Sequence, residues 1–130
     1  MLAKVMSENE ISKVVVNCCF NIHKQYGPGL FESVYEEIIC YELKKAGLNF
    51  QRQQGVRVIH NGVNMGIGFI PDIVIENKVI VELKSVENLA EVHYKQLTTY
   101  LKITNLKLGL LVNFNVPLIK LGLHRIVNKL

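Results

Sequence analysis

The chain has 130 residues, of which 49% are hydrophobic, and its formal net charge is +4. This length fits one compact domain over residues 1–130 and excludes a second, while the apolar runs are far shorter than the roughly 20 residues of a membrane-spanning helix. Glu8 and Glu10 lie where a signal peptide would be apolar, so we expect a cytoplasmic protein with no membrane contact.

Two helices are predicted in the first third of the chain. Ser7 and Glu10 form a capping-box motif, and apolar residues follow at helical spacing until Gly27-Pro28-Gly29 ends the run. A second helix is expected to open at Leu30 and to end at Gly47. Its apolar residues form two stripes, which predicts that the helix is largely buried. The stripes are Val34, Ile38 and Tyr41, and Tyr35, Ile39 and Leu43.

Strands are predicted after residue 50, where the apolar period changes. Asn61-Gly62 is a strong hairpin signal, and Glu76-Asn77-Lys78 separates two runs, 73–75 and 79–81, that are apolar on both faces. Asn88 with Glu91 predicts the start of a third helix, which ends around residue 105. A buried strand is expected at residues 108–114, followed by a short one at 124–127.

The predicted order of elements is helix, helix, three strands in a meander, helix, strand. A strand that follows a helix returns to its sheet by a crossover, which makes it parallel to its neighbour. The predicted fold class is therefore α/β with a mixed sheet.

Asp72 is the only aspartate in the chain, and it stands at the start of an apolar strand where a charge is unexpected. If the following turn has three residues, Ile75 pairs with Val79, and Asp72 then lies opposite Glu82 and on the same face as Lys84. A two-residue turn would break this pairing. Like charges on adjacent strands repel each other, so a dry pair of carboxylates requires a shared proton or a cation.

A divalent ion satisfies this requirement. Two carboxylates and water suit Mg²⁺ or Mn²⁺ better than zinc, and in a nuclease such an ion activates water and neutralises phosphate charge. Lys84 would orient the water or steady the phosphate. The Glu-x-Lys spacing carries no weight alone, because it also occurs at Glu42 and Glu76. On geometry alone, a strand that ends in solvated charges explains these residues equally well.

The cysteines and histidines of the chain predict no second metal or catalytic site. Cys18, Cys19 and Cys40 are interpreted as buried free thiols, and the four histidines lack the short spacings that hold a structural zinc. His93 is interpreted as a packed or helix-capping residue. The positive net charge suits a polyanionic partner, although many proteins without one share it.

Five motifs occur in a fixed order along the chain. They are Gly29-Leu30-Phe31-Glu32-Ser33-Val34-Tyr35, Pro71-Asp72, Val81-Glu82-Leu83-Lys84, Gln96-Leu97-Thr98-Thr99-Tyr100 and Leu111-Val112-Asn113-Phe114. In this order they resemble the motifs of the PD-(D/E)XK nuclease superfamily and, within it, of the bacterial GxxExxxY-type group. The resemblance spans nearly the whole chain. It implies a restriction-endonuclease-like αβββαβ core with an added N-terminal helix.

The resemblance also extends the site. It implies that Glu32 is a further acidic member, whereas its plainer interpretation is a helix-start carboxylate favoured by the helix dipole. Gln96 and Tyr100 resemble the Gln-x-x-x-Tyr motif of recombination-type exonucleases, which contacts nucleic acid or braces the site. Their plainer interpretation is an amphipathic pair whose polar tips are satisfied internally.

One position departs from the pattern of the family. Many relatives carry a basic residue two positions before the aspartate, where this chain has Ile70, and the candidates to replace that charge are Arg52, Arg57 and Lys95.

The sequence is therefore compatible with two functions. The first is hydrolysis of phosphodiester bonds in DNA or RNA, with Asp72 and Glu82 binding Mg²⁺ or Mn²⁺ and Lys84 assisting. The second is a catalytically impaired nuclease-fold module that binds nucleic acid or a protein partner. A homodimer through the apolar N-terminal helix is compatible with both.

Overall fold

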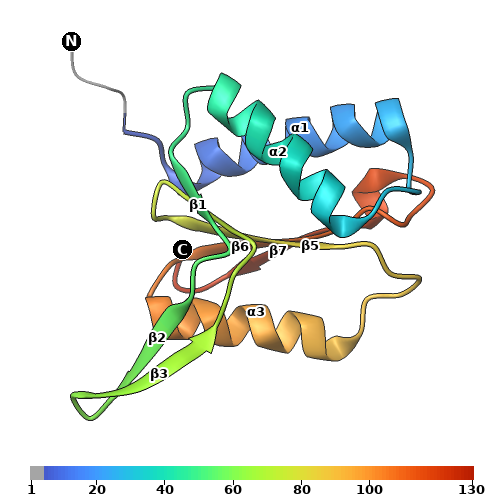
Figure 1. Cartoon of the computed structure of the whole chain (residues 1–130). Coiled ribbons are helices and arrows are strands. Elements are labelled where there is room, and N and C mark those ends of the chain that lie inside the picture. Colours follow the sequence, from blue (N-terminus) through green and yellow to red (C-terminus); the bar gives the residue numbers. More distant parts are fainter. Residues whose placement is uncertain (1–4) are drawn as a thin grey trace.

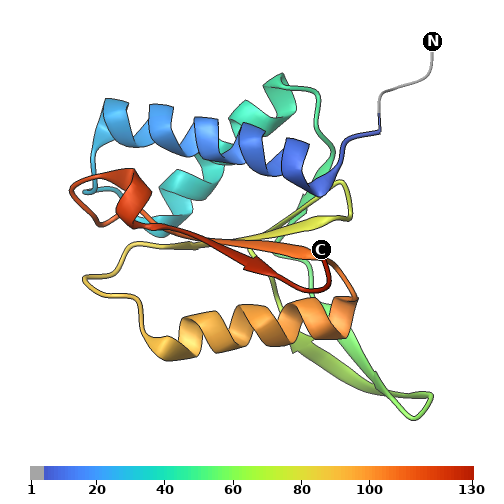
Figure 2. The same ribbon diagram turned by 180° about the vertical axis from the view of Figure 1, so that it is seen from behind.

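Three helices lie on the two faces of a central sheet in the computed structural model, which describes residues 5–130. α1 (Glu8–Tyr26) and α2 (Glu32–Lys45) cover one face, and α3 (Glu91–Thr104) covers the other (Figure 1). The view from behind shows the same three layers (Figure 2). None of the helices in this described range is long and apolar enough to cross a membrane.

The central sheet has five strands in the order β1-β4-β5-β6-β7. The strands are β1 (Phe50–Arg52), β4 (Ile73–Ile75), β5 (Val79–Lys84), β6 (Leu108–Asn113) and β7 (Leu123–Val127). β5 and β6 are parallel because α3 makes the crossover between them, and the other neighbours are antiparallel. This confirms the predicted α/β class with a mixed sheet. A short 3₁₀ helix, η1 (Ile119–Leu121), precedes the last strand.

The hairpin at Asn61-Gly62 forms outside the central sheet. β2 (Val56–His60) and β3 (Val63–Phe69) pair only with each other, and they project from the side of the molecule that carries α3 (Figures 1 and 2). Asn61 and Gly62 have φ of 50° and 78°, as a tight hairpin turn requires. The meander of the central sheet consists of β1, β4 and β5, so the hairpin is an insertion after its first strand.

The helix boundaries confirm part of the prediction. Ser7 and Glu10 form the expected capping box, in which Ser7 Oγ accepts from Glu10 N at 3.2 Å. The second helix begins at Glu32 rather than at Leu30. The third begins at Glu91 without Asn88, because His93 Nδ1 accepts a hydrogen bond from Ala90 N at 3.0 Å. His93 is thus a helix-capping residue, as predicted.

The prediction that α2 is buried on two stripes was wrong. Tyr35, Ile39 and Leu43 are fully buried against the sheet, but Tyr41 on the other stripe is 66% exposed. A helix in an outer layer presents only one face to the core, so its second apolar stripe meets solvent or other side chains.

Side chains alternate between the two faces of β5. Val79, Val81 and Leu83 belong to the core under α1 and α2, whereas Ile80 packs with Leu97 and other residues on the side of α3. The same alternation directs Glu82 and Lys84 toward the face of α3. The three cysteines are free, and Cys19 and Cys40 are buried as predicted, whereas Cys18 is only half-buried.

The Tyr35 hydroxyl holds the loop between α1 and α2. It donates to the carbonyl oxygen of Gly27 at 2.5 Å and accepts from the backbone N–H of Leu30 at 3.1 Å, while its ring stacks on Phe114 with centroids 4.0 Å apart. The tyrosine of the first motif therefore has a structural role.

Tyr35→Phe should lower the free energy of unfolding by about 2 kcal/mol, because it leaves two backbone groups without their partner in a part-buried loop. Urea unfolding measures this change. Tyr41→Phe is the control, since Tyr41 is 66% exposed, and it should change stability by less than about 0.5 kcal/mol. Equal effects of the two substitutions would contradict the role of the hydroxyl.

Candidate active site at the edge of β4 and β5

The turn between β4 and β5 has the three residues that the register argument requires. Ile75 pairs with Val79 and Ile73 pairs with Val81. Glu76 and Asn77 in the turn both have φ of 52°. Continued by one residue, this register places Asp72 opposite Glu82. The predicted pairing of the two strands is confirmed.

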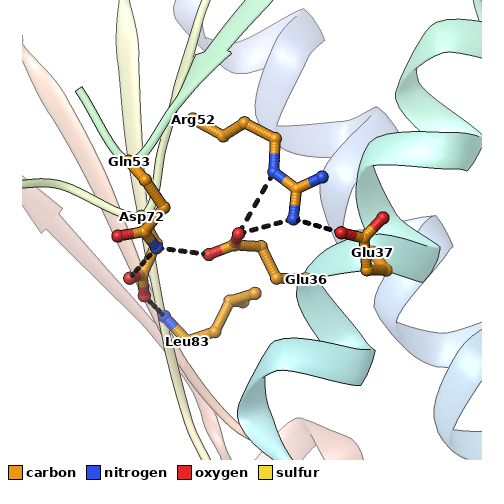
Figure 3. Close-up of polar contacts among 6 residues, drawn as sticks. All are labelled: Glu36, Glu37, Arg52, Gln53, Asp72 and Leu83. Atoms are coloured by element: carbon orange, nitrogen blue, oxygen red, sulfur yellow. Dashed lines mark hydrogen bonds and ion pairs between the residues drawn. The ribbon is translucent and has the colours of Figure 1, made fainter.

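Both carboxylate oxygens of Asp72 accept hydrogen bonds (Figure 3). Oδ2 accepts from the backbone N–H of Leu83 at 2.8 Å, and Oδ1 accepts from Gln53 Nε2 at 3.0 Å. Both donors are neutral, so the aspartate is oriented without losing its negative charge to a salt bridge.

Glu82 is the buried member of the pair. Glu82 is only 8% exposed, and its Oε1 has no hydrogen-bond partner among the described residues. Burial, followed by the negative charge of Asp72, raises the pKa of Glu82 to about 8, and Lys84 acts in the opposite direction. A buried, unpartnered carboxylate oxygen beside a second carboxylate is a site that a proton or a cation would satisfy.

The donor set fits a hydrated divalent ion better than a fully protein-bound one. Within residues 5–130, no group of three or more His, Cys, Asp or Glu side chains could hold a metal ion by itself. Asp72 and Glu82 offer two carboxylates, and water would complete the shell. Mg²⁺ usually keeps several waters and binds proteins through one or two carboxylates, whereas zinc favours nitrogen and sulfur ligands.

Glu32 and Lys84 lie on either side of the end of β5. Glu32 Oε2 accepts from the backbone N–H of Ser85 at 2.9 Å, which brings the helix-start carboxylate to the residue after Lys84. Glu32 and Asp72 also line one surface pocket. The structure thus brings the predicted acidic residue of α2 to the same edge of the sheet as Asp72.

A family model described as PD-(D/E)XK nuclease superfamily matches residues 9–126. The chain belongs to the PD-(D/E)XK nuclease superfamily. No curated protein and no solved structure matches it significantly. The mixed sheet between helices agrees with the restriction-endonuclease-like fold of this superfamily, whose nucleases generally use divalent metal ions. Membership in the GxxExxxY-type group stays a prediction.

The two predicted site residues on α3, Gln96 and Tyr100, differ in their relation to the carboxylates. The Tyr100 ring stacks on Phe69 with centroids 4.0 Å apart. The pKa of Tyr100 is raised, first by burial and then by the negative charges of Glu82 and Asp72, so its hydroxyl lies within their electrostatic reach. Gln96 lies one turn earlier, is exposed, and has no side-chain hydrogen bond within the described range.

Two residues that the sequence did not single out, Glu36 and Gln53, lie near Asp72 (Figure 3). Glu36 is buried, and its Oε1 accepts from Gln53 Nε2 at 2.7 Å. Its Oε2 accepts from Arg52 Nη2 at 2.7 Å and Nε at 3.2 Å. Glu36 follows Glu32 by one helical turn, and that spacing could have revealed it. Gln53 carries no such signal, because only the pairing of β1 with β4 brings it to Asp72.

None of the three basic residues named as candidates to replace a charge at Ile70 donates a hydrogen bond to Asp72. Arg52 is bound to Glu36 and to Glu37, whose carboxylate lies 2.9 Å from Nη2. Lys95 pairs with Glu91 at the surface at 3.6 Å. The third candidate, Arg57, is exposed on the projecting hairpin. Neutral donors therefore orient Asp72.

Proposed function

We propose that this chain hydrolyses phosphodiester bonds in nucleic acid, with a divalent ion bound between Asp72 and Glu82. The observation that carries the proposal is the buried Oε1 of Glu82, which has no partner in the described part of the chain and faces the charge of Asp72. Membership in a nuclease superfamily gives this pair of carboxylates its chemical context.

Each side chain of the site has a separate role in the proposed reaction. Asp72 and Glu82 would hold Mg²⁺ or Mn²⁺, which supplies an activated water and neutralises charge on the phosphate. Lys84 places a positive point charge on the same face of β5, where it orients the water or steadies the phosphate. Tyr100 braces the α3 side of the site through its stack on Phe69.

The partner that fits this site is a polyanion. The net charge of +4 favours association with nucleic acid, and we propose DNA as the first substrate to test, with RNA as the alternative.

Purified protein should cleave at least one of linear DNA, circular DNA, branched DNA or RNA when Mg²⁺ or Mn²⁺ is present. Cleavage should stop when EDTA removes the ion, because two carboxylates without a cation cannot activate water. Gel electrophoresis of end-labelled substrates detects the products. Cleavage that continues in EDTA, or a complete lack of cleavage on all four substrates, would contradict the proposal.

A second candidate function rests on Ile70 and on the lack of a larger group of metal ligands in residues 5–130. In this case the chain retains the nuclease fold and binds nucleic acid without cutting it. Binding would then weaken steeply with salt and would not require a divalent ion. Fluorescence anisotropy at several salt concentrations, with and without Mg²⁺, separates the two functions.

A further inference from the structure

The side-chain amide of Gln53 joins two carboxylates from different parts of the fold. Nε2 lies 2.7 Å from Glu36 Oε1 on α2 and 3.0 Å from Asp72 Oδ1 at the start of β4 (Figure 3). A primary amide has two N–H bonds, so both donors are used.

The backbone of Gln53 also binds Asp72. Its N–H donates to the carbonyl oxygen of Asp72 at 3.0 Å, directly after the last pair of the β1–β4 ladder, which joins Arg52 to Ile73. Gln53 has φ of 52°, a left-handed backbone conformation that residues other than glycine and asparagine rarely adopt. Its contacts hold it in this conformation and direct its side chain at the aspartate.

The charges in this cluster are separated. Arg52 binds Glu36 at 2.7 Å and Glu37 at 2.9 Å, so its positive charge is neutralised on the helix side. Among residues 5–130, the hydrogen-bond donors to the carboxylate of Asp72 are both neutral, Gln53 Nε2 and Leu83 N. An arginine in that place would hold the aspartate equally well but would compete with a cation for its charge.

We propose that Gln53 is a positioning residue for the metal site. Together with Leu83 N it fixes the plane of the Asp72 carboxylate toward Glu82, and it replaces the basic residue that is missing at Ile70. Its effect on metal binding rests on the proposed function, whereas its effect on the orientation of Asp72 does not.

The test uses the fact that Asp72 is the only aspartate of the chain. Protein labelled with carbon-13 at the aspartate carboxyl group gives one side-chain carboxyl signal, and a titration with Mg²⁺ then reports ion binding without any nucleic acid. Gln53→Met removes both donors at similar size, and it should displace the ion-free signal and raise the Kd for Mg²⁺ about 10- to 100-fold.

Gln54→Met is the matched control, because Gln54 is exposed next to Gln53. It should leave the signal in place and the Kd within about twofold. Gln53→Asn is a second variant for the case that methionine does not tolerate the left-handed backbone. Asparagine adopts this conformation readily but is one methylene too short to span both carboxylates. It too should raise the Kd.

Arg52→Met separates positioning from stability. It removes the positive charge that pairs with Glu36 without removing a donor from Asp72, so it should lower stability in urea yet raise the Kd for Mg²⁺ less than about threefold. If Gln53→Met weakens Mg²⁺ binding no more than Arg52→Met, the proposal is overturned. If Mg²⁺ does not move the wild-type signal, the proposed function fails. In that case the carboxyl signal of Asp72 without Mg²⁺ still tests whether Gln53 orients Asp72. A signal displaced from its wild-type position in Gln53→Met but not in Gln54→Met supports this role. A signal that stays in place in Gln53→Met overturns the role.

Discussion

Asp72→Ala and Glu82→Gln should each lower the rate of metal-dependent cleavage by about 1,000-fold, which corresponds to about 4 kcal/mol of transition-state stabilisation. Each substitution removes one of only two carboxylates that face each other across β4 and β5. With one carboxylate of this pair removed, the ion is neither held nor positioned next to the water that it activates. Single-turnover cleavage of the best substrate at saturating Mg²⁺ measures the loss.

Glu87→Gln is the control for this experiment, because Glu87 is an exposed carboxylate shortly after β5. It should leave the rate within about twofold of wild type. Binding of nucleic acid by Glu82→Gln should persist in anisotropy measurements, since Glu82 is buried and the substitution leaves the positive net charge of the chain in place. Cleavage that survives either ligand substitution unchanged would assign the reaction to other residues.

The second large effect concerns the dependence of stability on pH in the absence of divalent ions. The pKa of Glu82 rises from 4.5 to about 8 on folding, first because of burial and then because of Asp72. Between these two values the folded state holds a proton that the unfolded state has released, so the free energy of unfolding falls as the pH rises. For this group alone, stability is highest below about 4.5 and reaches its lower limit once the pH passes about 8.

Glu82→Gln should remove this fall, because an amide does not titrate. At pH 9 in EDTA the variant should be more stable than wild type by an amount on the order of 5 kcal/mol, given about 1.4 kcal/mol for each unit of difference between the folded and unfolded pKa of Glu82. Urea unfolding at pH 5, 7 and 9 measures the effect, with Glu87→Gln as the control. Parallel pH profiles for wild type and Glu82→Gln would show that Glu82 is not the buried acid.

Added Mg²⁺ should stabilise wild type more than Glu82→Gln. In wild type at pH 9 it binds the charged carboxylates of the folded state and restores stability, whereas Glu82→Gln should gain little. This comparison links the stability measurement to the ion site that the cleavage experiment tests.

Local patterns in the sequence were sufficient for much of the fold. The capping box at Ser7, the hairpin turn at Asn61-Gly62 and the three-residue turn after Ile75 depend on residues close together in the chain, and the structure confirms each of them. The register that faces Asp72 toward Glu82 follows from a turn of three residues, which the sequence left open against a turn of two and the structure decided. Period-two alternation correctly separated Val81 from Glu82.

Other features were decided only by the tertiary structure. Periodicity identified β2 and β3 as strands but not their exclusion from the central sheet, because strand propensity does not specify a partner. It also overestimated the burial of α2, since Tyr41 meets solvent while Tyr35 meets the sheet.

The surroundings of Asp72 show most clearly the difference between contacts that the local sequence predicts and contacts that depend on the tertiary structure. The aspartate and Glu82 are joined by a short hairpin, and their pairing could be predicted from the sequence for a turn of three residues. Gln53 and Glu36 reach the site from 19 and 36 residues away, through the β1–β4 ladder and the packing of α2. Neighbouring residues encode turns and periodicity, whereas contacts between distant segments depend on how whole elements pack, which no local pattern specifies.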